Sequence, residues 1–214
     1  MRGSSLIYAA LAAGLAIGAG VAASLWWRGA AGPPPPRIGG YVLPEPRALG
    51  AFELVDDSGA KFEPSGFAGR WSFLYFGYTY CPDVCPLTLV EFGELKKKLA
   101  ERTPAAAVAF YFVSVDPERD TPARLHEYVS YFDPEFRALT GDPAQLAVLA
   151  NAVGAVYFVP PGQDEKTYLV SHSSNIALVE PSGGLRAVFT SPHAAGQLAD
   201  DFAAIFARYG AAPR

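Results

Sequence analysis

The chain has 214 residues, of which half are hydrophobic and 18% are charged, and its net charge is −4. This composition is typical of a folded protein, because disordered chains have far less apolar surface to bury. Arg2 and Arg28 are the only charged residues before residue 29, so the remainder carries a net charge of −6. Such an acidic remainder argues against a nucleic-acid partner, which selects a basic face.

An uncharged stretch comes first, at residues 6–27, with the sequence LIYAALAAGLAIGAGVAASLWW. As a helix, these 22 positions span about 33 Å, enough to cross a hydrocarbon core of about 30 Å. Trp26 and Trp27 close the stretch, where aromatic rings suit the headgroup region. A cleaved signal peptide has an apolar core of only about 7–15 residues. We therefore interpret residues 1–28 as one transmembrane anchor, although small residues at 21–24 leave cleavage open.

Residues 29–40, GAAGPPPPRIGG, are rich in proline and glycine. Four consecutive prolines favour a stiff polyproline II spacer, which predicts a linker between the anchor and a folded domain. The domain then covers residues 41–214, a length that suits a single domain with one hydrophobic core.

The first half of this domain predicts strands joined by short connections. Residues 51–64, AFELVDDSGAKFEP, indicate a hairpin around an Asp-Ser-Gly turn. Residues 71–78, WSFLYFGY, and residues 107–116, AVAFYFVSVD, are apolar runs of strand length, typical of the buried middle of a sheet. Between them a helix is expected from Pro86, with one face formed by Leu89, Val90, Leu95 and Leu99.

The second half predicts helices with clear start signals. Thr121–Pro122 and Asp142–Pro143 each pair a capping residue with a proline in the first helical turn. Gly154 is expected to end the second of these helices.

A second hairpin and a last helix complete the chain. Residues 175–180 and 185–190 flank PSGG, and residues 193–210 have the pattern of an amphipathic helix. Strand–helix–strand crossovers require parallel strands, and the hairpin is expected to add antiparallel edges. The sequence therefore predicts an α/β, thioredoxin-like fold, preceded by one transmembrane helix. Its mixed central sheet has helices on both faces and an additional N-terminal β-hairpin.

The only two cysteines, Cys81 and Cys85, lie together in GYTYCPDVCP, residues 77–86. This loop connects the first buried strand to the first helix. The free N–H groups of a helix N-terminus lower the pKa of thiols there. The carboxyl ends of parallel strands are also where such sheets bind ligands. The loop is therefore the candidate site.

Three interpretations of the cysteine pair remain open at this point. A structural disulfide across so short a loop restrains the unfolded chain little. A redox dithiol is possible, but thioredoxin uses C-x-x-C, whereas here C-x-x-x-C follows Tyr80. Two thiolates also suit Cu(I) or zinc. The chain has no second cysteine pair for an all-thiolate zinc site and only the initiator Met1, so a third ligand must come from His126, His172 or His193.

Among the histidines, His172 is the expected ligand. In thioredoxin-like folds the loop before the last hairpin faces the cysteine loop and usually carries a proline. Here that stretch, residues 171–180, reads SHSSNIALVE, and it contains His172 and no proline. His126 falls within a helix and is interpreted as structural. His193 is expected to cap or begin the last helix and is the weaker candidate.

Three motifs, in order, resemble those of the Sco/SenC family of assembly factors for cytochrome c oxidase. They are GYTYCPDVCP, FVSVDPERDTP (residues 112–122) and SHSSNIALVEPSG (residues 171–183), and the resemblance runs from about Gly50 to the end. The resemblance implies that Cys81, Cys85 and His172 bind copper, as Cu(I) or Cu(II). It also implies delivery of copper, or of reducing equivalents, to the dinuclear copper centre of oxidase subunit II.

Some acidic residues of these motifs are expected to have supporting roles. Asp83 resembles the aspartate of the cysteine motif and is interpreted as a solvated loop residue or helix cap, with tuning of the site or partner contact as the functional alternative. Asp116 and Asp120 are expected to be structural. Many relatives carry Asp directly before the ligand histidine, whereas this chain has Ser171 there, which is expected to alter copper affinity.

The expected function is that of a membrane-tethered copper metallochaperone, with subunit II and other copper chaperones as partners. The main alternative is a thiol–disulfide oxidoreductase in which Cys81 and Cys85 reduce the copper-ligand cysteines of the oxidase. A peroxidase would need further residues that the sequence does not show, and an interaction module with an inert disulfide is a third class. Without an Arg/Ser-rich transit peptide, the expected location is the bacterial inner membrane, with the domain in the periplasm.

Overall fold

The computed structural model describes residues 13–24, 26, 34–103, 106–159 and 168–210. Residues 1–34 and residues 35–214 form two separate compact units. In the first unit, residues 13–24 are helical. Across the described residues, no helix combines the length and the apolar character needed to cross a membrane. Residues 1–12, 25, 27 and 28 of the proposed anchor and residues 29–33 of the linker lie outside the described residues.

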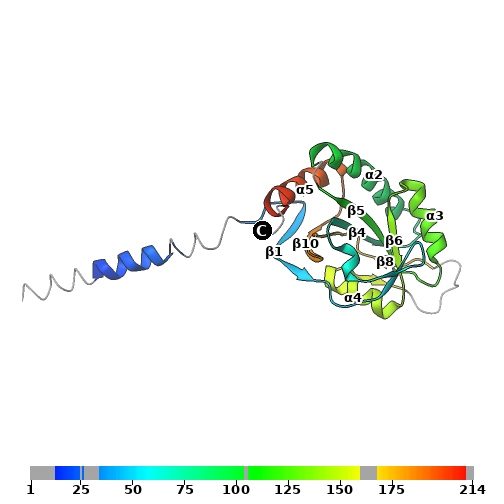
Figure 1. The fold of residues 1–214 in the computed structure, drawn as a ribbon, viewed down its shortest axis with the longest axis horizontal. Coiled ribbons are helices and arrows are strands. Elements are labelled where there is room, and N and C mark those ends of the chain that lie inside the picture. Colours follow the sequence, from blue (N-terminus) through cyan, green and yellow to red (C-terminus); the bar gives the residue numbers. More distant parts are fainter. Residues whose placement is uncertain (1–12, 25, 27–33, 104–105, 160–167, 211–214) are drawn as a thin grey trace, which may run out of the picture. The chain divides into compact units, whose positions relative to one another are not determined.

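The second unit is built around one mixed sheet of eight strands, in the order β1-β10-β9-β4-β5-β6-β2-β3 (Figure 1). Its strands are β1 (Gly40–Ala48), β2 (Leu54–Asp56), β3 (Lys61–Phe62), β4 (Trp71–Gly77), β5 (Val108–Ser114), β6 (Arg137–Thr140), β9 (Ile176–Val179) and β10 (Gly184–Phe189). Strands β4, β5 and β6 run parallel, and the other neighbours pair antiparallel. A small second sheet pairs β7 (Tyr157–Phe158) with β8 (Ser171–His172).

Helices cover both faces of the main sheet, as predicted. The α-helices of this unit are α2 (Val84–Arg102), α3 (Pro122–Phe132), α4 (Pro143–Val153) and α5 (Ala195–Tyr209), and η1 (Pro64–Phe67) is a short 3₁₀ helix. Figure 1 shows α2, α3 and α5 on one side of the sheet and α4 on the other. Strand β4 is buried throughout. Its Phe73 and Tyr75 pack in the core beneath α2 and α5, whereas Leu74 and Phe76 pack in the core on the α4 side.

The predicted helix signals are confirmed. The Thr121 side chain accepts a hydrogen bond from the backbone N–H of Arg124, and Asp142 does the same for Ala144 and Gln145. Gly154 ends α4 in the left-handed conformation, with φ of 73°, which only glycine adopts without strain.

Four strands were not predicted, namely β1 and β6 of the main sheet and the pair β7 and β8, and β1 changes the edge of the main sheet. The hairpin of residues 175–190 is not an edge, because β9 pairs with β4 and β10 pairs with β1. Pro44 and Pro46 in β1 argue against a strand, yet proline is tolerated on an edge strand, where a missing N–H faces solvent. Strand β6 has only four residues, too few to show a period.

Two boundaries also differ from the prediction. Helix α2 begins at Val84 rather than Pro86, so Cys85 lies in its first turn. Val90, expected on the buried face, is 54% exposed, whereas Leu89, Leu95 and Leu99 are buried. Ile38, which lies within the predicted linker, already packs against the core, so the folded part of the chain begins before Tyr41.

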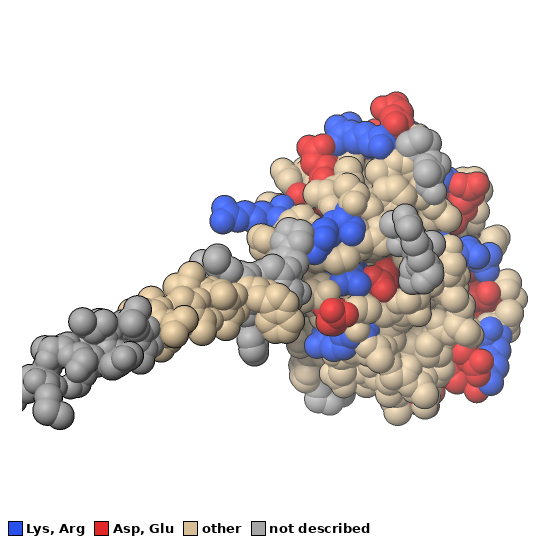
Figure 2. Space-filling model, turned by 60° about the vertical axis from the view of Figure 1, so that its left-hand side comes forward, with Lys and Arg blue, Asp and Glu red and all other residues tan. Residues whose placement is uncertain are grey.

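The surface carries charges of both signs. Figure 2 shows Lys and Arg side chains interspersed with Asp and Glu on one face of the molecule. On the face shown, neither sign forms a continuous field.

Candidate metal centre

The structure brings together the three residues expected to bind metal. The loop after β4 carries Cys81, the first turn of α2 carries Cys85, and β8 carries His172. The two sulfurs and a ring nitrogen of His172 all lie within 4.8 Å of one another. Cys85 Sγ is 3.4 Å from His172 Nε2. Both cysteines are free thiols, Cys85 buried and Cys81 half-buried.

The ring of His172 directs an unprotonated nitrogen to the sulfurs. Its Nδ1 lies 3.1 Å from the carbonyl oxygen of Ser173. A carbonyl only accepts hydrogen bonds, so Nδ1–H is the donor and, in the neutral ring, Nε2 keeps its lone pair. The ring also meets Tyr75 and Tyr78 edge to face, each at 6.0 Å between centroids. This orientation suits a metal ligand, since the second nitrogen of such a histidine ordinarily donates to a carbonyl or carboxylate.

The two thiols influence each other's protonation in opposite directions. The pKa of Cys81 is lowered, chiefly because Cys85 donates a hydrogen bond to it, and further by its interaction with the His172 ring and by the backbone N–H groups of Asp83 and Cys85. The pKa of Cys85 is raised, first by that same hydrogen bond and then by burial. Of the two thiols, Cys81 is therefore the one that loses its proton more readily.

A buried carboxylate supports the cysteine loop from below. Asp120 is fully buried and accepts hydrogen bonds from the Thr79 backbone N–H (3.0 Å), the Thr79 hydroxyl (2.6 Å) and the Ser114 hydroxyl (2.6 Å). Burial raises its pKa, although these bonds act against the shift. Asp116, also buried, pairs with Arg119 and accepts a hydrogen bond from the Tyr168 hydroxyl. These contacts agree with the structural roles expected of both aspartates.

Gly77 leaves the space that the Cys85 sulfur occupies. A Cβ at this position would lie 2.7 Å from Cys85 Sγ and 2.8 Å from Cε2 of Phe112. Sequence reasoning did not assign a role to Gly77, although it is the first residue of the cysteine motif.

The remaining residues singled out by sequence lie around the site or away from it. His126 pairs with Asp57 through Nδ1 at 2.9 Å, with a side chain 64% exposed, and is not part of the cluster. The prediction that His193 caps or begins the last helix is wrong, because Ala194 is the N-cap of α5 and the helix begins at Ala195. His193 Nε2 donates a hydrogen bond to the carbonyl of Ser174 instead. Asp83 is the exposed N-cap residue of α2, and its side chain makes no capping hydrogen bond.

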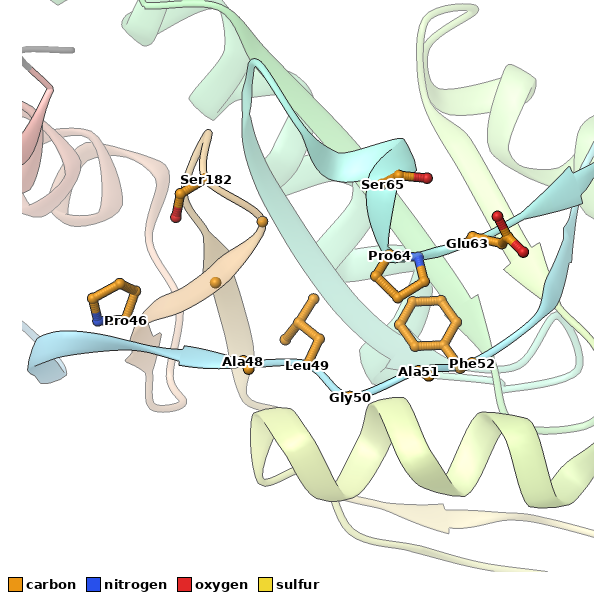
Figure 3. A pocket seen from close by; sticks show the side chains of 12 residues that line it. Pro46, Ala48, Leu49, Gly50, Ala51, Phe52, Glu63, Pro64, Ser65 and Ser182 are labelled. Carbon is orange, nitrogen blue, oxygen red and sulfur yellow. The ribbon is translucent and has the colours of Figure 1, made fainter. Parts of the chain in front are cut away.

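A large hollow of about 710 Å³ lies elsewhere, between the end of β1, η1 and the β9–β10 turn. Figure 3 shows the rings of Phe52 and Pro64 beside it, with Leu49 between them and Pro46. Its lining contains no cysteine or histidine. Among the described residues, the group of side chains placed to hold a metal ion is the one in the cysteine loop and β8.

Comparisons with known proteins identify relatives of this chain. The profile of the SCO1/SenC family matches residues 43–207. A protein of Stutzerimonas stutzeri is 42% identical over 155 residues, covering 71% of this chain and 73% of the relative. The mitochondrial SCO1 homolog 1 of Arabidopsis thaliana is 35% identical over 151 residues, covering 71% of this chain and 45% of that protein. The chain thus matches about half the length of such mitochondrial relatives.

Solved structures share the fold. Arabidopsis thaliana ScoI with copper bound has a TM-score of 0.70 at 33% identity, covering 75% of this chain and 98% of that structure. Bradyrhizobium japonicum ScoI with copper bound has a TM-score of 0.62 at 34% identity, covering 71% and 95%. The mixed sheet with helices on both faces is thus the thioredoxin-like fold of these proteins. By its profile match, its relatives and its fold, the chain belongs to the SCO1/SenC family.

Proposed function

We propose that this protein binds one copper ion through Cys81 Sγ, Cys85 Sγ and His172 Nε2. The observation that carries the proposal is the convergence of these three atoms within 4.8 Å from two distant segments. Two related structures are described with copper bound, which supports the choice of metal. Thiolates are soft ligands that select Cu(I), and imidazole also suits copper, so this donor set accommodates both oxidation states.

We further propose that copper is cargo, delivered to the dinuclear copper centre of cytochrome c oxidase subunit II. Cys81 and His172 are half-buried, and Pro82, Asp83 and Val84 beside them are exposed, so a partner's ligand can approach the site. Three ligands also leave room for an incoming fourth during exchange. An N-terminal anchor would hold the domain at the bacterial inner membrane, facing the periplasm, where that copper centre is assembled.

The second candidate is a thiol–disulfide oxidoreductase acting on the cysteines of the same copper centre. It is favoured by one specific observation, the lowered pKa of the half-buried Cys81 thiol, because a thiolate is the attacking species in disulfide exchange. In this reaction the Cys81 thiolate attacks the acceptor disulfide, and Cys85 then displaces the acceptor thiol. The acceptor gains two electrons and a Cys81–Cys85 disulfide forms.

An anaerobic Cu(I) titration of the full chain, followed by X-ray absorption spectroscopy, tests copper binding. We expect one copper per chain with two sulfur neighbours and one nitrogen neighbour. Binding without a nitrogen neighbour would contradict the assignment of His172, and a lack of stoichiometric binding would overturn the proposal.

Two mixing experiments then separate delivery from reduction. The copper-loaded chain is mixed with the reduced copper domain of subunit II, and the metal-free reduced chain is mixed with the oxidised domain. Delivery predicts copper transfer in the first mixture. Disulfide reduction in the second mixture, with no transfer in the first, would favour the oxidoreductase.

A further inference from the structure

We propose that Arg119 is a positioning residue that holds the histidine segment, residues 168–172, against the cysteine loop. Arg119 touches neither sulfur nor the His172 ring in the contacts described, so it would act through the segments that carry them. This inference rests on the proposed copper site, but the geometry that it concerns is present in the metal-free protein.

Arg119 bridges the two segments directly. Its Nη1 donates to the carbonyl oxygen of Tyr168 at 3.0 Å, and its Cζ lies 3.5 Å from the centroid of the Tyr168 ring. On the other side, the same Cζ lies 4.7 Å from the ring of Tyr80, the residue before Cys81. One guanidinium group therefore contacts both a residue next to the first cysteine and a residue four positions before His172.

A buried carboxylate fixes the guanidinium group in place. Arg119 Nε lies 2.5 Å from Asp116 Oδ2, and the two side chains are only 9% and 1% exposed. The other oxygen of Asp116 accepts a hydrogen bond from the Tyr168 hydroxyl, so the histidine segment is tied to this ion pair twice. Ion pairs held in low-dielectric surroundings constrain geometry more strongly than exposed pairs do.

Tyr78 links the histidine segment and Arg119 to the imidazole ring of His172. The side chain of Tyr78 accepts a hydrogen bond from the backbone of Val170, and its ring meets the His172 ring edge to face. Tyr78 also lies beside Arg119, whose Cζ is 5.8 Å from the tyrosine centroid. The ring of His172 is thus set against residues whose positions Arg119 defines.

Lysine cannot replace this arginine. A planar guanidinium group donates in several fixed directions and stacks on aromatic rings, whereas an ammonium group is a compact point charge. Arg119→Lys keeps a charge partner for Asp116, which protects the fold, but loses the stacking between Tyr80 and Tyr168. The substitution therefore removes the bridge while leaving a positive charge in place.

Arg124 provides a matched control, because its guanidinium group also lies over the ring of Tyr80. Its Cζ lies 4.2 Å from the Tyr80 centroid, and its Nε donates to the Thr79 hydroxyl at 2.7 Å. Among the described residues, its side-chain partners belong to the cysteine loop and to Asp120, not to the histidine segment. Arg124→Lys should thus disturb the loop without releasing His172.

The first test uses the metal-free, reduced full chain. Nuclear Overhauser contacts between the His172 ring and the rings of Tyr75 and Tyr78 are compared in wild type, Arg119→Lys and Arg124→Lys. We expect the contacts to be lost in Arg119→Lys and kept in Arg124→Lys, with the amide spectrum of β4 unchanged in both. Retained contacts in Arg119→Lys would overturn the proposal. If that variant does not fold, Tyr168→Phe, which breaks only the hydroxyl tie to Asp116, is expected to weaken the same contacts, and unchanged contacts there would overturn it.

The second test is a mutant cycle on Cu(I) affinity. Arg119→Lys is expected to lower the affinity by about 10–100-fold in the wild-type background, as for other residues that orient a ligand. In a His172→Ala background it should cost less than about twofold, because the ligand that it positions is gone. Equal losses in both backgrounds would show a general effect on the fold and reject the proposal. A wild-type chain that binds no copper would defeat the proposed function, while the first test would still decide the role of Arg119.

Discussion

The cysteine loop and the histidine segment reach one site by different means. The loop connects β4, which is buried throughout, to α2, whose buried face runs from Cys85 to Leu99. The buried Asp120 carboxylate holds this loop by accepting two hydrogen bonds from Thr79. The positions of the two sulfurs are therefore set by the main sheet and its first crossover helix.

The end of the histidine segment that carries His172 depends on fewer and more exposed contacts. Strand β8 has two residues and pairs with β7, outside the main sheet. The Ser173 backbone N–H donates to the carbonyl of Val156 at 2.7 Å, and Phe158 in β7 is 60% exposed. Local stability follows buried contacts, so this segment is expected to open more readily than the loop. The comparison teaches that the main fold fixes the two sulfurs, whereas the position of the His172 ring depends on a short strand outside the main sheet.

The largest expected effect comes from removing Cys81, a proposed ligand in the cysteine loop. Cys81→Ser should lower Cu(I) affinity by more than the about 100-fold typical of residues that only orient a ligand. Because Cys81 is half-buried, the fold should be unchanged. Competition with a chromophoric Cu(I) chelator measures the affinity, and thermal unfolding checks the fold. Affinity within tenfold of wild type would mean that the loop does not hold the metal.

Removing His172, the proposed ligand on β8, should have a smaller effect. His172→Ala is expected to weaken Cu(I) binding by about 10–100-fold, since two thiolates remain and only the distant ligand is lost. The nitrogen neighbour should disappear from the X-ray absorption spectrum. His126→Ala is the matched control, because His126 pairs with Asp57 outside the cluster. Equal behaviour of the two variants would reject the ligand role of His172.

The same comparison explains what the sequence could predict. Residues 71–78 and the two capped helices carry strong local signals, so both ends of β4 and α4 and the start of α3 were predicted close to their observed positions. The cysteine pair was found because both residues lie in one loop between such elements. His172 was found only through the expected fold and the family resemblance, since it has no local signal.

What was missed depends on contacts between distant segments. Strand β1 contains two prolines and is formed through pairing with β10, which no local pattern shows. Arg119 could be read only as part of a turn motif, because its partners Tyr80 and Tyr168 are 39 and 49 residues away. Gly77 has a role only because the Cys85 side chain points toward it. Such assignments require coordinates.

A third prediction tests how tightly the main fold fixes the loop. Gly77→Ala places a methyl group 2.7 Å from Cys85 Sγ, so it should lower the free energy of unfolding by about 1–3 kcal/mol and weaken copper binding less than His172→Ala does. Gly93→Ala in α2 is the control, since its Cβ would meet nothing within 4 Å, and it should stabilise the helix by about 0.5–1 kcal/mol. Chemical denaturation measures both. If Gly77→Ala is as stable as wild type, the main fold does not fix the position of the Cys85 side chain as tightly as proposed.

The smallest expected effect concerns the protons of the two thiols in the metal-free protein. The pKa of Cys81 is lowered chiefly by the hydrogen bond from Cys85, and alkylation rates follow the thiolate fraction. We therefore expect the rate of Cys81 alkylation in wild type to stay nearly constant as the pH falls from 8 to 6. In Cys85→Ala the donor is gone, so the pKa should rise toward the ordinary value of about 8.5, and the rate should fall about tenfold per pH unit. Mass spectrometry at several pH values measures both rates. The same falling profile in both proteins would show that Cys85 does not set the protonation of Cys81, and that the loop only positions the two sulfurs for the metal.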